Sequence, residues 1–283
     1  MHKAADSRVA DAPPLRGVFV SVRPVPGRSR RWAALGAAVV LLAPPCLAKD
    51  ASLEVELAPY AWLAGVDGDV SVAGRSASFD DSFSDLISDV DAGAMGMGAV
   101  RYGRLVVFGQ FDYIDLSSDA EITGDLGPEG LPVGTKVDGD VETTIATGAV
   151  GWRFDLFRRH EVDLLLGVRR LDMDVRLKGE RDSSSASDNI TDTIIMVSPT
   201  FHLSGKWFVR ALISYGIAGD SDTTWELQPH VHYRLTPRVT LGLGYRRLHY
   251  DISSGEKGTV QYQEFDADLH GLLFGVAWRI GGE

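Results

Sequence analysis

The sequence predicts an all-β fold, a transmembrane antiparallel up-and-down barrel of about ten strands, with eight or twelve strands as alternatives. Three observations predict it: side chains alternate in polarity, connections alternate in length, and charge is sorted between the connections. The alternation is clearest in residues 225–235, WELQPHVHYRL, where a period of two indicates a strand with one apolar and one ionisable face. In a soluble sheet the apolar face meets the core, whereas in a membrane barrel it meets lipid.

Ten segments show this strand character. Several reach ten residues or more, longer than the usual five or six residues of soluble strands and close to the length that crosses a bilayer. The predicted strands cover about 53–63, 93–102, 104–116, 141–154, 161–175, 193–203, 206–217, 224–235, 238–250 and 265–280.

The connections between these strands fall into two kinds. Every second connection is tight, at residues 103, 155–160, 204–205 and 236–238, and the others are mostly long. The predicted long loops cover 64–92, 117–140, 176–192 and 251–264, with a shorter one at 218–223. Short turns on one side and long loops on the other are typical of membrane barrels.

Charge follows the same division. The tight turns carry basic residues, whereas the first two long loops are rich in Asp and Glu. All lysines after residue 48 are expected in loops, turns or the tail, so the polar strand faces carry Gly, Ser, Thr, Arg and His instead. This composition favours a confined interior over an open surface, which Lys and Glu usually coat. The net charge of −11 disfavours nucleic acid as a partner.

The first 48 residues have the layout of a signal peptide. A basic stretch, RSRR at 28–31, precedes the apolar run WAALGAAVVLL, and small residues lead to a predicted cleavage site after Ala48. The apolar run is too short for a membrane helix, which needs about 20 residues. A lipid anchor on Cys46 is disfavoured because Pro45 precedes it. Residues 49–283 are predicted to form the barrel domain, without cysteine and therefore without disulfides or thiolate metal sites.

The polar strand faces predict a network that lines the lumen. Its ten predicted members are Gln110, Asp112, Arg169, Arg210, Glu226, Gln228, His230, His232, Arg234 and Arg246. Bulky side chains fill the interior of barrels of this size, so a narrow or plugged lumen is expected. His230 and His232, with Glu226 on the same face, could also form a zinc site. A hydrogen-bonding network is the preferred interpretation, and we expect no metal there.

Two further features are candidates for special roles. The stretch FDDSFSDLISDVD at 79–91 has helical spacing at Phe83, Leu86, Ile87 and Val90, and predicts either a short helix that plugs or covers the barrel or an ordinary acidic loop. His249 and Asp251 lie near the outer rim and are the candidates for a hydrolase. No nucleophile motif accompanies them, so no enzymatic activity is expected.

The chain resembles bacterial outer-membrane β-barrel proteins over about residues 52–280. The resemblance rests on five stretches: APYAWLAGVDGDV, SFSDLISDVDAGAMGMGAVRYGRLVVFGQFDYIDLS, LLLGVRRLDMD, LGLGYRRLHYD and the closing LLFGVAWRI. The last resembles the C-terminal assembly signal of these barrels. It departs from the pattern at Ile280, where an aromatic residue is usual, and in the three residues that follow.

The resemblance implies an integral protein of the outer membrane of a Gram-negative bacterium, reached by Sec-type export with cleavage of the signal peptide. Implied partners are outer-membrane lipid and lipopolysaccharide, the barrel assembly machinery during biogenesis, and a small solute or ion. No cofactor is expected. The expected role is structural or small-solute permeation; the alternatives are a surface binding module that uses the acidic loops and a rim hydrolase.

Overall fold

The strands form a closed barrel. The computed structural model describes residues 52–72, 75–81, 90–121, 136–179, 183–255, 257, 259 and 262–281. Its elements are β1 (Leu53–Val72), β2 (Arg75–Asp81), β3 (Val90–Tyr102), β4 (Leu105–Glu121), β5 (Lys136–Leu156), the 3-10 turn η3 (Phe157–Arg159), β6 (His160–Gly179), β7 (Ser183–Ser204), β8 (Trp207–Gly219), β9 (Thr223–Arg234), β10 (Val239–Ser254) and β11 (Gln263–Gly281).

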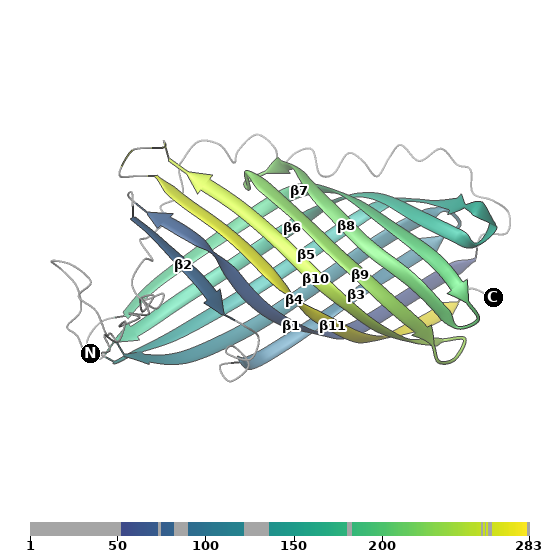
Figure 1. The fold of residues 1–283 in the computed structure, drawn as a ribbon, viewed down its shortest axis with the longest axis horizontal. Coiled ribbons are helices and arrows are strands. Elements are labelled where there is room, and N and C mark those ends of the chain that lie inside the picture. Colours follow the sequence, from purple (N-terminus) through teal and green to yellow (C-terminus); the bar gives the residue numbers. More distant parts are fainter. Residues whose placement is uncertain are drawn as a thin grey trace, which may run out of the picture.

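Antiparallel pairing runs around the wall in sequence order, and β11 returns to pair with β1 (Figure 1). Ten strands form this closed wall, and β2 extends the same sheet by pairing with the outer part of β1, on the edge that β3 occupies nearer the turn side. The prediction of a ten-stranded antiparallel barrel is therefore confirmed. No helical segment of the described chain is long and apolar enough to cross a bilayer.

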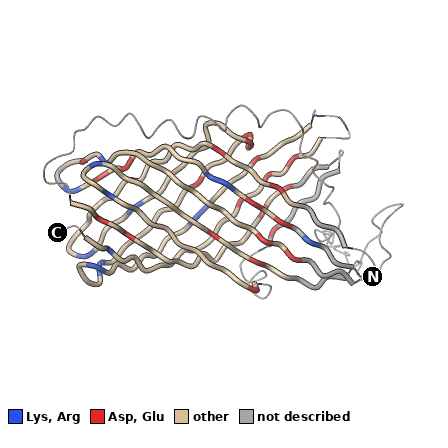
Figure 2. The backbone as a smooth tube through the Cα atoms, turned by 180° about the vertical axis from the view of Figure 1, so that it is seen from behind, with Lys and Arg blue, Asp and Glu red and all other residues tan. Residues whose placement is uncertain are grey.

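Tight turns join the strands at one end of the barrel. Gly103 and Gly205 adopt φ angles of +59° and +52°, a region that side-chain-bearing residues rarely occupy. The C-terminus lies at this same end, and acidic residues concentrate toward the opposite end (Figure 2). We call the two ends the turn side and the outer side.

The outward faces carry a continuous apolar belt. On β10, Leu241, Leu243 and Tyr245 are exposed, and Arg247 follows them at the next outward position. On β11 the exposed stripe includes Leu272, Phe274, Trp278 and Ile280. Exposed apolar side chains over about nine residues of strand match the requirement for crossing a membrane. The apolar face of residues 225–235 lies on this belt as well, with Leu227 and Val231 exposed.

The inward faces fill the lumen with side chains. Two apolar clusters are buried inside the wall. The outer cluster consists of Trp62, Ile145, Leu171, Ile190, Leu248, Tyr250 and Leu273. The inner cluster consists of Val106, Ala149, Leu165, Ile194, Met196 and Leu212. A polar layer separates them, and its geometry is given below.

The predicted long loops were wrong in part. The strands β5, β6 and β7 have 21, 20 and 22 residues. Both ends of the predicted loop 117–140 and most of 176–192 therefore belong to hydrogen-bonded ladders. The segment 64–92 likewise contains the end of β1, all of β2 and the start of β3. Outside the bilayer a strand needs no apolar face. The alternation of apolar and polar residues therefore ends there, although the strand and its hydrogen bonds continue. For the same reason Lys136 and Lys178 lie in strands.

The predicted helix at 79–91 was wrong at both ends. Residues 79–81 belong to β2, and Val90 begins β3. Val90 pairs with Leu116 across the β3–β4 ladder, which overrides the weak helical spacing. Phe83, Leu86 and Ile87 lie outside the described residues, as do the predicted signal peptide and its cleavage site.

Candidate functional site

Four charged side chains form a layer across the middle of the lumen. Asp112, Arg169, Glu226 and Arg246 are each at most 2% exposed, and we call them the central ionic layer. Glu226 accepts hydrogen bonds from Arg169 and, at 2.6 Å, from Arg246. Arg246 also donates to Asp112 at 2.8 Å. These contacts tie β4, β6, β9 and β10 together through the centre of the barrel.

Neutral polar groups complete this layer. Arg169 donates to the Ser214 hydroxyl at 2.6 Å, and Gln228 donates to Glu226. The Tyr60 hydroxyl donates to Asp112. Charged pairs buried this fully are held in place only when further hydrogen bonds satisfy them. The layer is therefore a fixed obstruction rather than a set of mobile side chains.

Apolar side chains cover the central ionic layer on both sides. The Arg246 guanidinium lies 4.2 Å from the centre of the Trp62 ring, in a cation–π contact. Trp62 belongs to the outer cluster, and the inner cluster begins on the turn side of the layer. An ion that enters from the outer side would have to cross this apolar packing before it reached the central ionic layer, which a hydrated ion does not favour.

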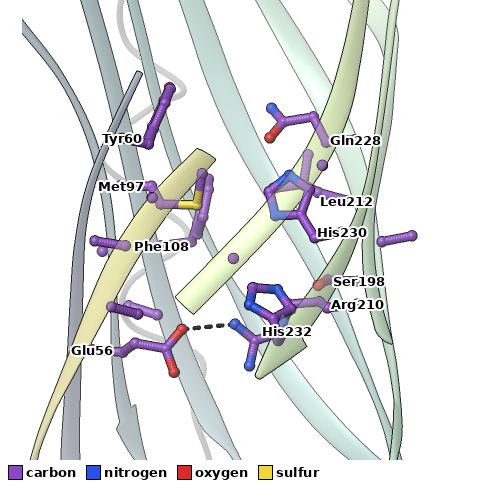
Figure 3. A pocket seen from close by; sticks show the side chains of 18 of the residues that line it. Glu56, Tyr60, Met97, Phe108, Ser198, Arg210, Leu212, Gln228, His230 and His232 are labelled. Carbon is purple, nitrogen blue, oxygen red and sulfur yellow. Dashed lines mark hydrogen bonds and ion pairs between the residues drawn. The ribbon is translucent and has the colours of Figure 1, made fainter. Parts of the chain in front are cut away.

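A small cavity remains on the turn side of the layer. Its volume is about 80 Å³, and we call it the turn-side cavity. Met97 and Phe108 line one wall, and His230 and His232 line the facing wall (Figure 3). Gly242 and Gly244 on β10 leave room for the histidine rings, since a Cβ on Gly244 would lie 2.3 Å from His230.

Ion pairs close the bottom of this cavity. Arg210 donates to Glu56 at 2.7 Å, a contact drawn in Figure 3, and Arg101 donates to Glu54 at 2.9 Å. Arg153 lies nearby and pairs with Asp163 at 2.8 Å. We call these six residues the turn-side ion pairs; they join β1 to β3 and β8, and β5 to β6.

The structure places the ten predicted lumen residues on inward-facing strand positions, and some of them contact residues outside the predicted set. Arg210 pairs with Glu56 rather than with the residues of β9. Arg234 lies over the Phe208 ring, 5.6 Å from its centre. The ring centres of His230 and His232 lie 5.5 Å apart in a tilted arrangement. Glu226, the candidate third zinc ligand, is held by two arginines.

Sequence reasoning missed Tyr60, Glu56, Arg101 and Met97. Glu54 and Glu56 alternate with apolar residues in LEVEL at 53–57, so strand periodicity was a usable signal for them. Tyr60 and Met97 carry no such signal, because an aromatic or apolar residue is equally suited to the lipid face. Their role follows only from the folded wall, which turns them inward.

The rim candidates lie on the outside of the barrel, beyond the apolar belt. The His249 Nδ1 atom is 3.6 Å from both Asp266 and Asp268. Asp251 lies one outward position further along β10. Burial and the neighbouring carboxylate of Asp222 raise the pKa of the Asp251 carboxyl above its ordinary value. The pair therefore belongs to an acidic outer surface and not to the lumen.

Comparisons with known proteins identify the fold but no family. No family model matches the sequence, and no curated protein matches it either. The outer membrane protease OmpT from Escherichia coli is similar in structure, with a TM-score of 0.50 and 8% identity over 82% of this chain and 97% of OmpT.

Two further solved structures show weaker similarity. One is Ail, the attachment invasion locus protein of Yersinia pestis, with a TM-score of 0.33 and 11% identity over 82% of this chain and 99% of Ail. The other is the translocator domain of the autotransporter NalP from Neisseria meningitidis, with a TM-score of 0.40 and 12% identity over 83% of this chain and 91% of that domain. Identities this low concern the fold alone. By fold, this chain is similar to bacterial outer-membrane β-barrels.

Proposed function

We propose that this protein is an integral outer-membrane barrel with a structural role, and that its lumen is closed to all but the smallest solutes. The central ionic layer supports this proposal most directly. Asp112, Arg169, Glu226 and Arg246 occupy the middle of the lumen without solvent exposure, and apolar clusters pack on both sides of them. Barrels of about this size have interiors that are largely filled by side chains.

Conductance in planar lipid bilayers tests the proposal. The folded protein is expected to give small conductance or none, because ions meet apolar packing and a salt-bridged layer on their path. Stable openings on the nanosiemens scale in the unmodified protein would contradict a closed lumen.

A charge-balanced pair of variants makes the test sharper. Replacing Glu226 and Arg246 together by Ala removes one acid and one base from the central ionic layer, and should raise conductance several-fold. The matched control replaces Arg247 and Asp268 by Ala, an outward-facing pair at 2.8 Å on β10 and β11. This control should conduct as the unmodified protein does.

The outer surface supports a second candidate, a binding module. Beyond the apolar belt the barrel wall carries charged groups on its outside, including the pairs Arg247–Asp268 and His270–Asp67. Polycationic ligands should bind this surface at low salt and dissociate at high salt if the role is correct.

Hydrolysis is not proposed. In the described structure His249 interacts with two carboxylates and the Trp225 ring, and no hydroxyl nucleophile is among these partners. Peptide and phospholipid hydrolysis assays on the unmodified protein and on His249→Ala test this directly, and equal background rates are expected.

A further inference from the structure

The turn-side cavity is lined by two histidines whose ring nitrogens are not satisfied. The Nε2 atoms of His230 and His232 are buried and have no hydrogen-bond partner within the described structure, and His232 is only 8% exposed. The hydrogen-bonding network expected from the sequence therefore leaves these two atoms out. A buried polar atom without a partner is costly, and native proteins contain few of them. Two such atoms on the wall of one cavity indicate that the cavity holds a ligand.

The volume of the cavity limits what this ligand is. About 80 Å³ is available, well below the roughly 300–1,000 Å³ of sites that bind small organic molecules. The space suits a single ion that side chains bind directly.

The carboxylates around the cavity already have partners. Glu56 accepts a hydrogen bond from Arg210 at 2.7 Å, and Asp163 accepts one from Arg153 at 2.8 Å. Among the residues that the structure describes, no group of three or more His, Cys, Asp or Glu is placed to hold a metal ion. A hard cation such as Ca²⁺ or Mg²⁺, which needs oxygen ligands, would therefore find no free carboxylate here.

The further donor in the cavity is a thioether sulfur. Met97 extends from β3 toward the histidines, and Figure 3 shows its sulfur atom directed into the cavity. Met196 lines the cavity as well, but it is packed within the inner cluster. A thioether is a soft, polarisable group, and soft sulfur ligands select Cu(I), a metal that imidazole also suits. The donor set is therefore two imidazoles and the Met97 thioether.

The two imidazole rings lie close enough to share an ion. Residues two positions apart on a strand are separated by about 6.6 Å, whereas the ring centres of His230 and His232 are 5.5 Å apart, so the two side chains lean toward each other. With a metal–nitrogen distance of about 2.0 Å, each ring centre lies about 3.1 Å from a bound ion, and this spacing gives an angle of about 125° at the ion. That angle is close to trigonal and leaves the remaining position for Met97.

Neighbouring groups hold the two rings in place. The Phe208 ring stacks on His232, with 4.6 Å between the ring centres and an interplanar angle of 10°. A Cβ on Gly242 would lie 3.2 Å from the His232 ring, and one on Gly244 would lie 2.3 Å from His230. Glycine at these two positions therefore leaves the room that the rings occupy. Such support from outside the ligand set orients metal-binding histidines.

We propose that the turn-side cavity binds one Cu(I) ion through His230, His232 and the Met97 sulfur. A monovalent ion suits this position beside Arg210, because its repulsion by the arginine and its desolvation are smaller than those of a divalent ion. The central ionic layer closes the lumen on the outer side of the cavity, so the ion enters from the turn side. The inference goes beyond the structural role proposed above and does not depend on whether the lumen conducts.

Competition with a chromophoric Cu(I) chelator measures the binding. The folded, untagged protein in detergent is titrated under anaerobic and reducing conditions without thiols, and the absorbance of the copper-loaded chelator is recorded. Transfer of one equivalent of Cu(I) per protein is expected, and Zn(II) should bind at least about ten-fold more weakly. No transfer, as from a cavity that holds only water, would overturn the proposal, and so would equal affinities for Zn(II) and Cu(I).

A conservative pair of methionine variants locates the ion. Met97→Leu keeps the size of the side chain and removes the sulfur, so it should weaken Cu(I) binding about ten-fold or more. It should also abolish the copper–sulfur signal in X-ray absorption spectra. Met173→Leu on β6, at a methionine that does not line the cavity, is the matched control and should retain both the affinity and the signal. Unchanged binding by Met97→Leu would refute the site.

The histidines are tested in the same titration. His230→Leu and His232→Leu should each weaken Cu(I) binding at least as much as Met97→Leu does. His270→Leu, on the outer side where His270 pairs with Asp67 at 2.8 Å, should bind as the unmodified protein does. Heat-dependent gel mobility shows that each variant is folded before it is titrated. A folded variant that lacks either cavity histidine and still binds Cu(I) at full affinity would contradict the proposal, whatever its conductance.

Discussion

Neutralising Glu226 is the most direct test of the central ionic layer. Glu226→Gln keeps the size and shape of the side chain and removes its charge. Glu226 is 1% exposed and holds both Arg169 and Arg246. The substitution leaves Arg169 buried without a carboxylate, while Arg246 retains Asp112 at 2.8 Å.

The expected loss of stability comes from Arg169, which loses its carboxylate partner, and not from Arg246, which keeps one. Removing one partner of a buried salt bridge typically destabilises a protein by about 3–5 kcal/mol, because the other charge stays desolvated. The uncompensated group here is Arg169, whose remaining partners are the hydroxyls of Ser214 and Thr224. We therefore expect Glu226→Gln to lower the free energy of unfolding by about 3–5 kcal/mol. Adding Arg169→Met should recover part of that loss, because it removes the orphaned charge.

Equilibrium unfolding in urea, with the protein reconstituted in lipid vesicles, measures these free energies. Asp268→Asn is the matched control, because it breaks an ion pair with Arg247 whose arginine side chain is 49% exposed. Exposed pairs contribute about 0–1 kcal/mol.

The reasoning would be refuted if Glu226→Gln cost no more than the control. That outcome would mean that water reaches the middle of the lumen and screens the charges, and the closed interior would then be wrong as well.

Three further predictions follow from the same interior. Tyr60→Phe removes the hydroxyl that donates to Asp112 and should lower the unfolding free energy by about 1–2 kcal/mol, measured in the same urea titration. Gly244→Ala places a Cβ 2.3 Å from the His230 ring and should cost about 1–3 kcal/mol through overpacking, whereas Gly148→Ala, with nothing within 4 Å, should be nearly neutral. The detergent-extracted protein should migrate anomalously on gels until it is boiled; unchanged mobility on heating would argue against a folded barrel.

Much of the wall was readable from sequence, because lipid imposes a strict alternation on each crossing strand. The stretch WELQPHVHYRL shows this well: Leu227 and Val231 lie on the exposed belt, and Glu226 and Gln228 are buried inside. The tight turns were also readable, since glycine at positions 103 and 205 marks the left-handed conformations found there.

The interior pairings were not readable. Arg210 and Glu56 are 154 positions apart in sequence, and Tyr60 reaches Asp112 across the lumen from a strand that is not its neighbour. Such contacts depend on strand number and stagger, which fix the inward positions that share one height in the barrel. The pattern of a single sequence predicts which residues face inward, but it does not predict which inward-facing side chains contact one another.

The length of β7 has a consequence for the outer side of the barrel. A tilted strand of 22 residues rises about 55 Å, and the lipid-facing band of such barrels is only about 25 Å tall. On the side of β7 the paired strands thus rise on the order of 30 Å beyond such a band, whereas β8 and β9, with 13 and 12 residues, are much shorter. A macromolecule that approaches from the outer side would touch these paired strands and the acidic residues at that end before it touched lipid (Figure 2).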